Sequence, residues 1–180
     1  MASSNNTPSA ERWVNLWAPW RMEYIDALDS GNDDCFLCRY RDTPADDERS
    51  LVVYRRERTM VVMNRFPYTG GHLLVAPMAH VGAMRDLSDA ELTELMTTLR
   101  DCQDLLGRAV KAEGYNVGFN IGHCAGAGLP GHIHMHVVPR WQGDTNFMTV
   151  LGDVRVIPQA LEALYRRLRE TAAEMGLLET

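Results

Sequence analysis

Long apolar runs, an excess of positive charge and a secretory leader are all missing from this chain of 180 residues. No segment approaches the roughly 20 apolar residues that a membrane span needs, so we expect no membrane partner. The net charge of −6 gives no long-range attraction for nucleic acid, and an anionic ligand must therefore be held by local donors. Residues 1–10 lack the features of a signal peptide, which predicts a disordered lead-in to a cytoplasmic protein.

Cysteine is also scarce, with four residues in the chain. A reducing compartment disfavours a structural disulfide, and Cys102, which lies in a helical pattern, is most simply a small core residue. Cys35 and Cys38 form a C-x-x-C pair, a spacing typical of a knuckle that brings two thiolates onto one metal ion. A thioredoxin-like redox pair is the alternative, but the two cysteines neither follow an obvious strand nor open a clear helix. A metal site here needs two more ligands.

The pattern of apolar residues predicts one α+β domain over residues 11–180, with an antiparallel sheet of about five strands and two main helices. A tryptophan-rich arm begins this domain. We see no internal repeat and no second domain. The expected strands are 51–55, 59–63, 72–77, 116–121 and a last strand that begins at 132.

Two helices complete the expected fold. A capping box formed by Ser88 and Glu91 opens the first helix, whose apolar residues keep three-four spacing until Gly114 ends it. Pro158 suits the first turn of the last helix. The apolar stripe of that helix consists of Leu161, Leu164, Leu168 and Met175.

Three histidines, His132, His134 and His136, alternate within the apolar run 131–139. Successive side chains on a strand point to opposite faces, so the three imidazoles are expected to share one face, with neighbours about 6.6 Å apart. A solvated strand face that happens to carry histidine is the alternative. However, three of the six histidines fall within five residues. Imidazole changes charge near neutral pH, so this row predicts acid–base, nucleophilic or metal chemistry.

A glycine-rich loop, residues 122–131, leads directly into the histidines. Its glycines allow backbone conformations that other residues avoid, and their amides can converge on an anion. Alone, this segment is an ordinary hairpin loop. Because three imidazoles follow it, a phosphate cradle is the better interpretation.

The segment His132-Ile-His-Met-His-Val-Val138 resembles the signature of the histidine triad family of nucleotide hydrolases and transferases. The segment 64–77 is similar to the family's nucleotide-binding hairpin. Segments 16–25 and 138–147 resemble a bacterial branch that includes diadenosine tetraphosphate phosphorylases. The resemblance spans roughly residues 13–170 and implies the same α+β fold, with sheets paired edge to edge in at least a homodimer.

The resemblance also implies roles for individual residues. His134 would attack the α-phosphorus of a nucleotide and form a covalent nucleotidyl-histidine. His136 would contact the phosphate oxygens, and the backbone carbonyl of His132 would orient the nucleophile. Asn64 matches the residue that binds the nucleoside. The expected phosphate-binding residues are Asn120, Gly126, Gly128, Gly131 and, as a charged clamp, Arg140.

Zinc-bearing members of the family supply the two missing metal ligands by resemblance. The implied set is Cys35, Cys38, His80 and His132, and a closed four-ligand set of this kind is structural rather than catalytic. Without the cysteines, His80 would be a surface histidine. His72 is expected simply to pack in its strand.

The implied activity is cleavage of dinucleoside polyphosphates, with diadenosine tetraphosphate and phosphate giving ADP and ATP. The loop 125–130 lacks the polar side chain that many hydrolase members carry, which favours phosphate over water as the acceptor. A hydrolase of dinucleoside polyphosphates or nucleoside phosphoramidates is the alternative. A non-catalytic nucleotide-binding signalling protein belongs to another class, and a zinc-knuckle nucleic-acid binder is disfavoured by the acidic charge.

Overall fold

The computed structural model describes residues 35–144 and 160–178. All of them belong to one compact unit, Asp33–Thr180. The expected lead-in, the tryptophan-rich arm and Pro158 lie outside the described residues. Within the described ranges, no helix combines the length and the apolar character that crossing a membrane requires.

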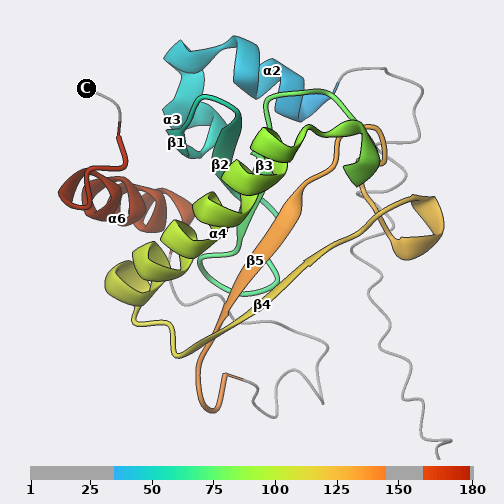
Figure 1. Ribbon diagram of the computed structural model, residues 1–180. Coiled ribbons are helices and arrows are strands. Elements are labelled where there is room, and N and C mark those ends of the chain that lie inside the picture. The colour runs from blue at the N-terminus through green and yellow to red at the C-terminus, as the bar shows by residue number, and fades with distance from the viewer. Residues whose placement is uncertain (1–34, 145–159, 179–180) are drawn as a thin grey trace, which may run out of the picture. The chain divides into compact units, whose positions relative to one another are not determined.

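A five-stranded antiparallel sheet forms the centre of the fold, with the strand order β1-β2-β3-β5-β4 (Figure 1). This confirms the α+β class and the number of strands. The first four strands lie within two residues of their expected bounds. The strands are β1 (Val52–Arg55), β2 (Thr59–Met63), β3 (Leu73–Pro77), β4 (Gly114–Phe119) and β5 (Met135–Arg140).

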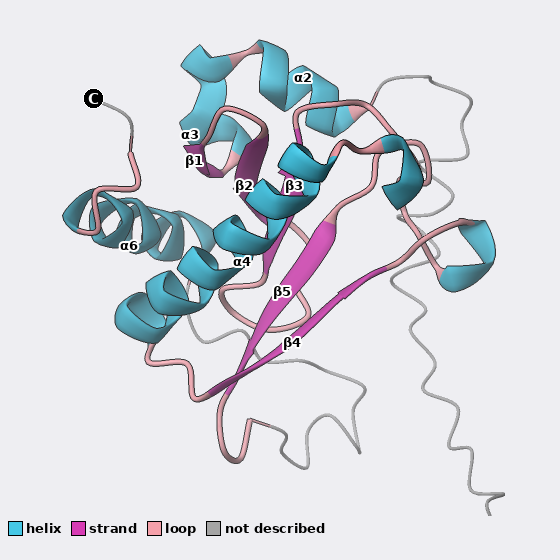
Figure 2. Ribbon diagram, in the orientation of Figure 1, coloured by secondary structure: helices cyan, strands magenta, loops and turns pink. Residues whose placement is uncertain are grey.

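Two long helices cover one face of this sheet, as Figure 2 shows. α4 (Asp89–Val110) begins with the expected capping box, in which the Ser88 hydroxyl accepts from the Glu91 N–H and the Glu91 side chain accepts from the Ser88 N–H. α6 (Leu161–Glu174) buries Leu164 and Leu168 against the same core. Both expected main helices are therefore present.

The end of α4 differs from the prediction. Lys111 adopts the left-handed conformation that closes the helix, with φ of 56°, so the helix ends at Val110 and Gly114 begins β4 instead. Glycine is the usual residue at such a cap. Because a lysine stands here instead, the sequence pattern does not predict that the helix ends at Val110.

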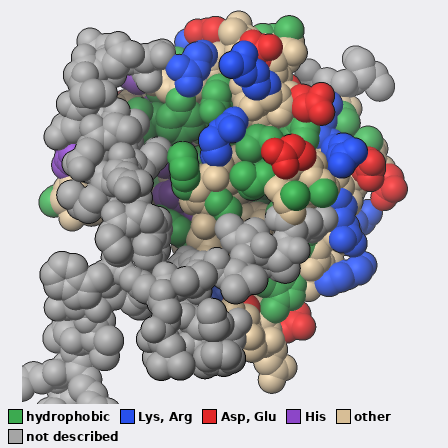
Figure 3. Space-filling view, turned by 180° about the vertical axis from the view of Figure 1, so that it is seen from behind, with side chains coloured by type: hydrophobic (Ala, Val, Ile, Leu, Met, Phe, Trp, Pro, Cys, Tyr) green, Lys and Arg blue, Asp and Glu red, His purple; other side chains and the backbone are tan. Residues whose placement is uncertain are grey.

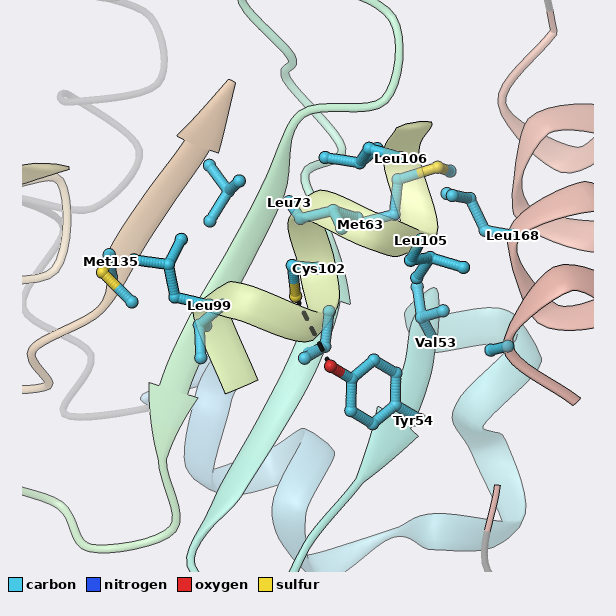
Figure 4. Close-up of a cluster of buried hydrophobic side chains, with 14 of the residues drawn as sticks. Val53, Tyr54, Met63, Leu73, Leu99, Cys102, Leu105, Leu106, Met135 and Leu168 are labelled. Atoms are coloured by element: carbon cyan, nitrogen blue, oxygen red, sulfur yellow. Dashed lines mark hydrogen bonds between the residues drawn. The ribbon is translucent and has the colours of Figure 1, made fainter. Parts of the chain in front are cut away.

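The core between α4 and the sheet is apolar, and Figure 4 shows its central side chains. Met63 and Leu73 project toward Leu105 and Leu106 of α4. Cys102 is fully buried, as expected, with its Sγ 3.5 Å from the Tyr54 hydroxyl oxygen. This packing fills the space between α4 and the sheet.

Shorter helices cover the opposite face of the sheet near β1–β3. They are α2 (Phe36–Asp42), a 3₁₀ turn at Pro44–Asp46 and α3 (Asp47–Ser50), and 3₁₀ turns also occur at Met84–Asp86 and His123–Ala125. Leu37 of α2 packs with Val62 and Leu74 in a second buried cluster. Strands β2 and β3 are therefore buried on both faces, which explains their continuous apolar runs.

Contrary to the sequence-based expectation, the C-x-x-C pair does open a helix. Cys35 is the N-cap of α2, and its Sγ accepts from the Cys38 N–H at 3.4 Å. The helix has only seven residues, too few to display a clear apolar period.

Candidate active site and metal centre

The three histidines stand where the glycine-rich loop enters the sheet, but β5 begins only at Met135. Ile133 would lie opposite Pro77, which has no N–H for the ladder, and its own N–H donates instead to the Val81 carbonyl at 2.7 Å. His132 and His134 therefore precede the strand. The strand starts later than expected, but the expected single face of imidazoles is confirmed, because Ile133, Met135 and Val137 all pack in the core on the α4 side. On the opposite face, the histidine row divides between two adjoining clusters.

His134 is held in one tautomer by the backbone. Its Nδ1 lies 2.9 Å from the carbonyl oxygen of His132. Because a carbonyl can only accept, Nδ1 must carry the proton and Nε2 keeps its lone pair. Burial lowers the pKa of His134, with the backbone hydrogen bond acting in the opposite direction. The result is a neutral imidazole with an unprotonated Nε2, which is the form that can act as a nucleophile.

His136 lies beside His134, with ring centroids 5.1 Å apart and the planes at 68°. It pairs with Leu74 of β3 and Gly118 of β4 in the middle of the sheet. Since Leu74 belongs to the cluster under α2, His136 projects from the sheet face opposite α4.

A fourth histidine, His72, joins this cluster, although the sequence indicated only strand packing. Its Nδ1 lies 3.1 Å from the Asn64 amide nitrogen and accepts from the Tyr68 N–H at 3.2 Å. The Asn64 amide orientation is fixed, because its oxygen accepts from the Phe66 N–H at 3.0 Å. With Nδ1 serving as an acceptor, the proton of a neutral His72 must sit on Nε2.

His72 in turn sets the proton position on His136. The His72 Nε2 lies 3.0 Å from the His136 Nδ1, so it donates there and leaves the His136 proton on Nε2. Burial, followed by the neighbouring His136 and His134, lowers the pKa of His72 to about 3, which keeps His72 neutral. Sequence reasoning could not find this contact, since it depends on the pairing of β3 with β5.

Asn120 and the glycine-rich loop complete the cluster. The Asn120 amide nitrogen lies 3.4 Å from the His136 Nε2 and 3.5 Å from the Gly126 carbonyl oxygen. A half-turn of this amide exchanges nitrogen for oxygen, so Asn120 can either donate to His136 or accept from it. The structure therefore brings Asn64, Asn120 and Gly126 to the histidines.

Gly131 and Arg140 lie away from the cluster formed by His72, His134 and His136. A Cβ on Gly131 would stand 3.5 Å from the His80 Nε2, at the cysteine cluster. Arg140 ends β5, roughly 13 Å along the strand from His136, where it binds Asp144 and the Asn116 amide oxygen. The structure therefore does not bring Arg140 to the histidines. Gly128 lies between these parts of the loop in a bend.

The second cluster is formed by Cys35, Cys38, His80 and His132, whose ligand atoms all lie within 4.8 Å of one another. Sγ–Nδ1 distances are 3.2 Å for Cys35–His132, 3.1 Å for Cys38–His80 and 3.5 Å for Cys38–His132. A tetrahedral zinc ion with its usual bond lengths separates sulfur and nitrogen ligands by about 3.5 Å. The donor set and its spacing therefore fit zinc.

Protonation at this cluster also suits a cation. His132 places its Nε2 2.9 Å from the Pro77 carbonyl oxygen, which puts the proton on Nε2 and aims the Nδ1 lone pair at the sulfurs. Burial raises the pKa of the Cys35 thiol to about 11, so a thiolate here needs a neighbouring positive charge.

A model of the HIT domain matches residues 46–143. The chain belongs to the HIT family. It is 39% identical over 158 residues to the AP-4-A phosphorylase of Mycobacterium tuberculosis, covering 85% of this chain and 81% of that protein. It is 36% identical to the asymmetrical bis(5'-nucleosyl)-tetraphosphatase of Schizosaccharomyces pombe, over 53% of this chain and 52% of that protein.

A solved structure of a HIT protein is also similar. The Zn-bound histidine triad family protein from Mycobacterium smegmatis superimposes with a TM-score of 0.62 at 26% identity, covering 77% of this chain and 95% of the other. The fold and the family expected from the histidine motif are thus both confirmed.

Proposed function

We propose that this HIT protein is a nucleotidyl transferase that cleaves dinucleoside polyphosphates, converting diadenosine tetraphosphate and phosphate into ADP and ATP. The observation that carries the proposal is the neutral, buried His134, whose Nδ1 proton is held by the His132 carbonyl. The name of the Mycobacterium tuberculosis relative, which matches most of the chain, supports the same substrate and the same acceptor.

The proposed first step is attack of the His134 Nε2 lone pair on the α-phosphorus. An N–P bond forms while the P–O bond to the leaving polyphosphate breaks, releasing ATP. His136 faces this centre with a proton on Nε2 and donates to the oxygens on which negative charge develops. In the second step, an oxygen of inorganic phosphate attacks the same phosphorus, so the N–P bond breaks and ADP leaves.

Substrate binding is assigned to groups around these histidines. We assign the nucleoside to Asn64, and the phosphates to Asn120 and the backbone amides near Gly126 and Gly128. The contacts of Asn64 with His72 and of Asn120 with His136 support this assignment. The protein's net negative charge requires that such donors be local.

The choice of acceptor gives a direct test. In phosphate-free buffer, turnover of diadenosine tetraphosphate should be slow, and millimolar phosphate should raise it by at least about 10-fold. Phosphorus NMR or chromatography should then identify ADP and ATP in equal amounts.

Two other results would change the assignment. Equal turnover without phosphate, with AMP and ATP as products, would make the protein a hydrolase. Tight nucleotide binding without turnover or a covalent adduct would indicate a signalling protein without catalysis.

We also assign a structural zinc ion to Cys35, Cys38, His80 and His132. When bound, the ion would supply a crosslink between the start of α2 and the residue that orients the nucleophile. The sulfur and nitrogen spacing of the cluster supports this assignment.

A homodimer formed edge to edge through β4 is the proposed assembly. β4 ends the sheet in the described part of the chain, pairing only with β5 there, and its central residues are exposed. Val117 on this strand is 41% exposed. An exposed sheet edge of this kind favours pairing with another strand.

Replacing Val117 by arginine should convert the dimer into a monomer, because two such charges would meet across the shared edge. Light scattering coupled to size-exclusion chromatography measures this change. Met84→Arg, at a similarly exposed apolar residue on a 3₁₀ turn, is the matched control and should stay dimeric. A wild-type monomer would contradict the proposal.

The expected partners are small nucleotides and phosphate rather than nucleic acid. In the view of Figure 3, positive and negative side chains of the described residues are interspersed, and no broad surface of one sign appears among them. All four cysteines are free, as a reducing cytoplasm would keep them, which supports the cytoplasm as the location.

A further inference from the structure

Tyr68 lies against His72 and His136. These two histidines connect Asn64 to the proposed reaction centre by hydrogen bonds. Tyr68 belongs to the connection between β2 and β3, and its half-buried ring stacks on His72 with centroids 4.7 Å apart and planes at 30°. The same ring stacks on His136, with centroids 5.8 Å apart and planes at 27°. One aromatic side chain therefore lines two imidazoles that are hydrogen-bonded to each other.

The main chain of Tyr68 contributes a second contact. Its N–H donates to the His72 Nδ1 at 3.2 Å, and this bond makes Nδ1 an acceptor. As a result, the His72 Nε2 proton points to the His136 Nδ1. Tyr68 thus acts on the ring orientation through its side chain and on the proton position through its backbone.

The connection that carries Tyr68 is fixed at several points. The Thr69 hydroxyl donates to the Pro139 carbonyl at 3.0 Å, and the His72 N–H donates to the Thr69 carbonyl at 3.2 Å. Gly71 has φ of +87°, and a Cβ there would stand 3.3 Å from Leu106 and Pro139 side chains. These contacts fix the position of Tyr68 relative to the imidazoles of His72 and His136.

An imidazole in a strand can still rotate about its last side-chain torsion, for which the energy wells are broad. The bond from His72 fixes one ring atom of His136, but it leaves the tilt of the ring about that atom open. A stacked aromatic face restricts this tilt, and offset stacking is the preferred arrangement of such rings. The two contacts together define where the His136 Nε2 proton points.

We propose that Tyr68 is a positioning residue that holds His72 and His136 so that the His136 Nε2 proton faces the scissile phosphate. The proposal rests on the proposed nucleotidyl transfer for its effect on rate. Its effect on the imidazoles is independent of any substrate.

The test compares Tyr68→Leu, which removes the aromatic face, with Tyr68→Phe, which keeps it. Misplacing the proton donor should lower kcat of the leucine variant by about 10- to 100-fold. A positioning residue acts on the rate of the reaction and not on binding, so KM should change by less than about 3-fold. The phenylalanine variant should stay close to wild type in both constants.

A second measurement needs no turnover. Nitrogen NMR of histidine-labelled protein without nucleotide reports which ring nitrogen carries the proton. Wild type and both variants should show His72 and His136 in the Nε2-protonated form, because each protein keeps the N–H of residue 68. In Tyr68→Leu alone, the His136 ring signals should broaden, since the imidazole is no longer held at one tilt. Phe66→Leu, which changes an exposed aromatic residue of the same connection, is the control and should leave both signals unchanged.

The outcomes separate the two proposals. If wild type fails to cleave dinucleoside polyphosphates but the His136 ring signals broaden in Tyr68→Leu, the proposed function falls and the positioning role stands. Unchanged His136 signals in a folded Tyr68→Leu protein would overturn the positioning role, whatever the kinetics. A rise in KM alone would also overturn it, because Tyr68 would then be a substrate contact.

Discussion

Replacement of His134 by alanine should lower turnover of diadenosine tetraphosphate by at least about 10⁴-fold, because it removes the atom that forms the covalent bond. His134→Asn should be equally inactive, since an amide is a very poor nucleophile toward phosphorus. Both variants should keep the fold, and nucleotide binding should remain close to wild type. Single-turnover labelling should trap an acid-labile nucleotidyl adduct on the wild type and none on either variant.

A histidine outside the cluster provides the control for this experiment. His123 is exposed on the 3₁₀ turn of the glycine-rich loop, so His123→Ala should retain most of the activity and form the adduct. Appreciable turnover by both His134 variants, with contaminating enzyme excluded, would remove His134 as the nucleophile.

Loss of the zinc site should produce the second large effect, on stability first and on activity second. Protein prepared without chelator should contain about one zinc ion per chain. Replacing Cys35 or Cys38 by serine should abolish zinc binding and lower the thermal midpoint by about 10 °C or more, since a closed metal site contributes directly to folding free energy. Metal analysis and calorimetry measure the two quantities.

Cys124 supplies the matched cysteine control. It is exposed and lies outside the four-ligand cluster, so Cys124→Ser should keep both zinc and the wild-type midpoint. Zinc-free wild-type protein, or cysteine variants as stable as Cys124→Ser, would contradict the assignment.

The parts of the site that lie close together in the chain were predictable from the sequence. The spacing of His132, His134 and His136 indicated the chemistry, and the short apolar runs predicted the strands. His80 lies far along the chain from the cysteines, and only the family resemblance connected them. The contact between His80 and the cysteines depends on how α2 packs against β3, and no local sequence pattern predicts that packing.

The remaining parts depended on strand register and on backbone detail. The contact between His72 and His136 requires Leu74 to pair with His136. The division of the histidine row follows from Pro77, whose missing N–H ends the ladder before Ile133. Arg140 is suitable for phosphate by its charge, but the sequence could not predict its bonds to Asp144 or its distance from the histidines along β5.

His132 serves two neighbours with two chemically separate parts of the same residue. Its imidazole faces the cysteines, while its carbonyl, a group that every amino acid possesses, fixes the proton of His134. The side chain at this position is therefore constrained by its contacts with the cysteine cluster, and the orientation of His134 does not depend on it. In an engineered protein that lacks both cysteines, another side chain could occupy this position if it filled the same buried space, bonded the Pro77 carbonyl and left the main chain from Pro130 to Ile133 in place.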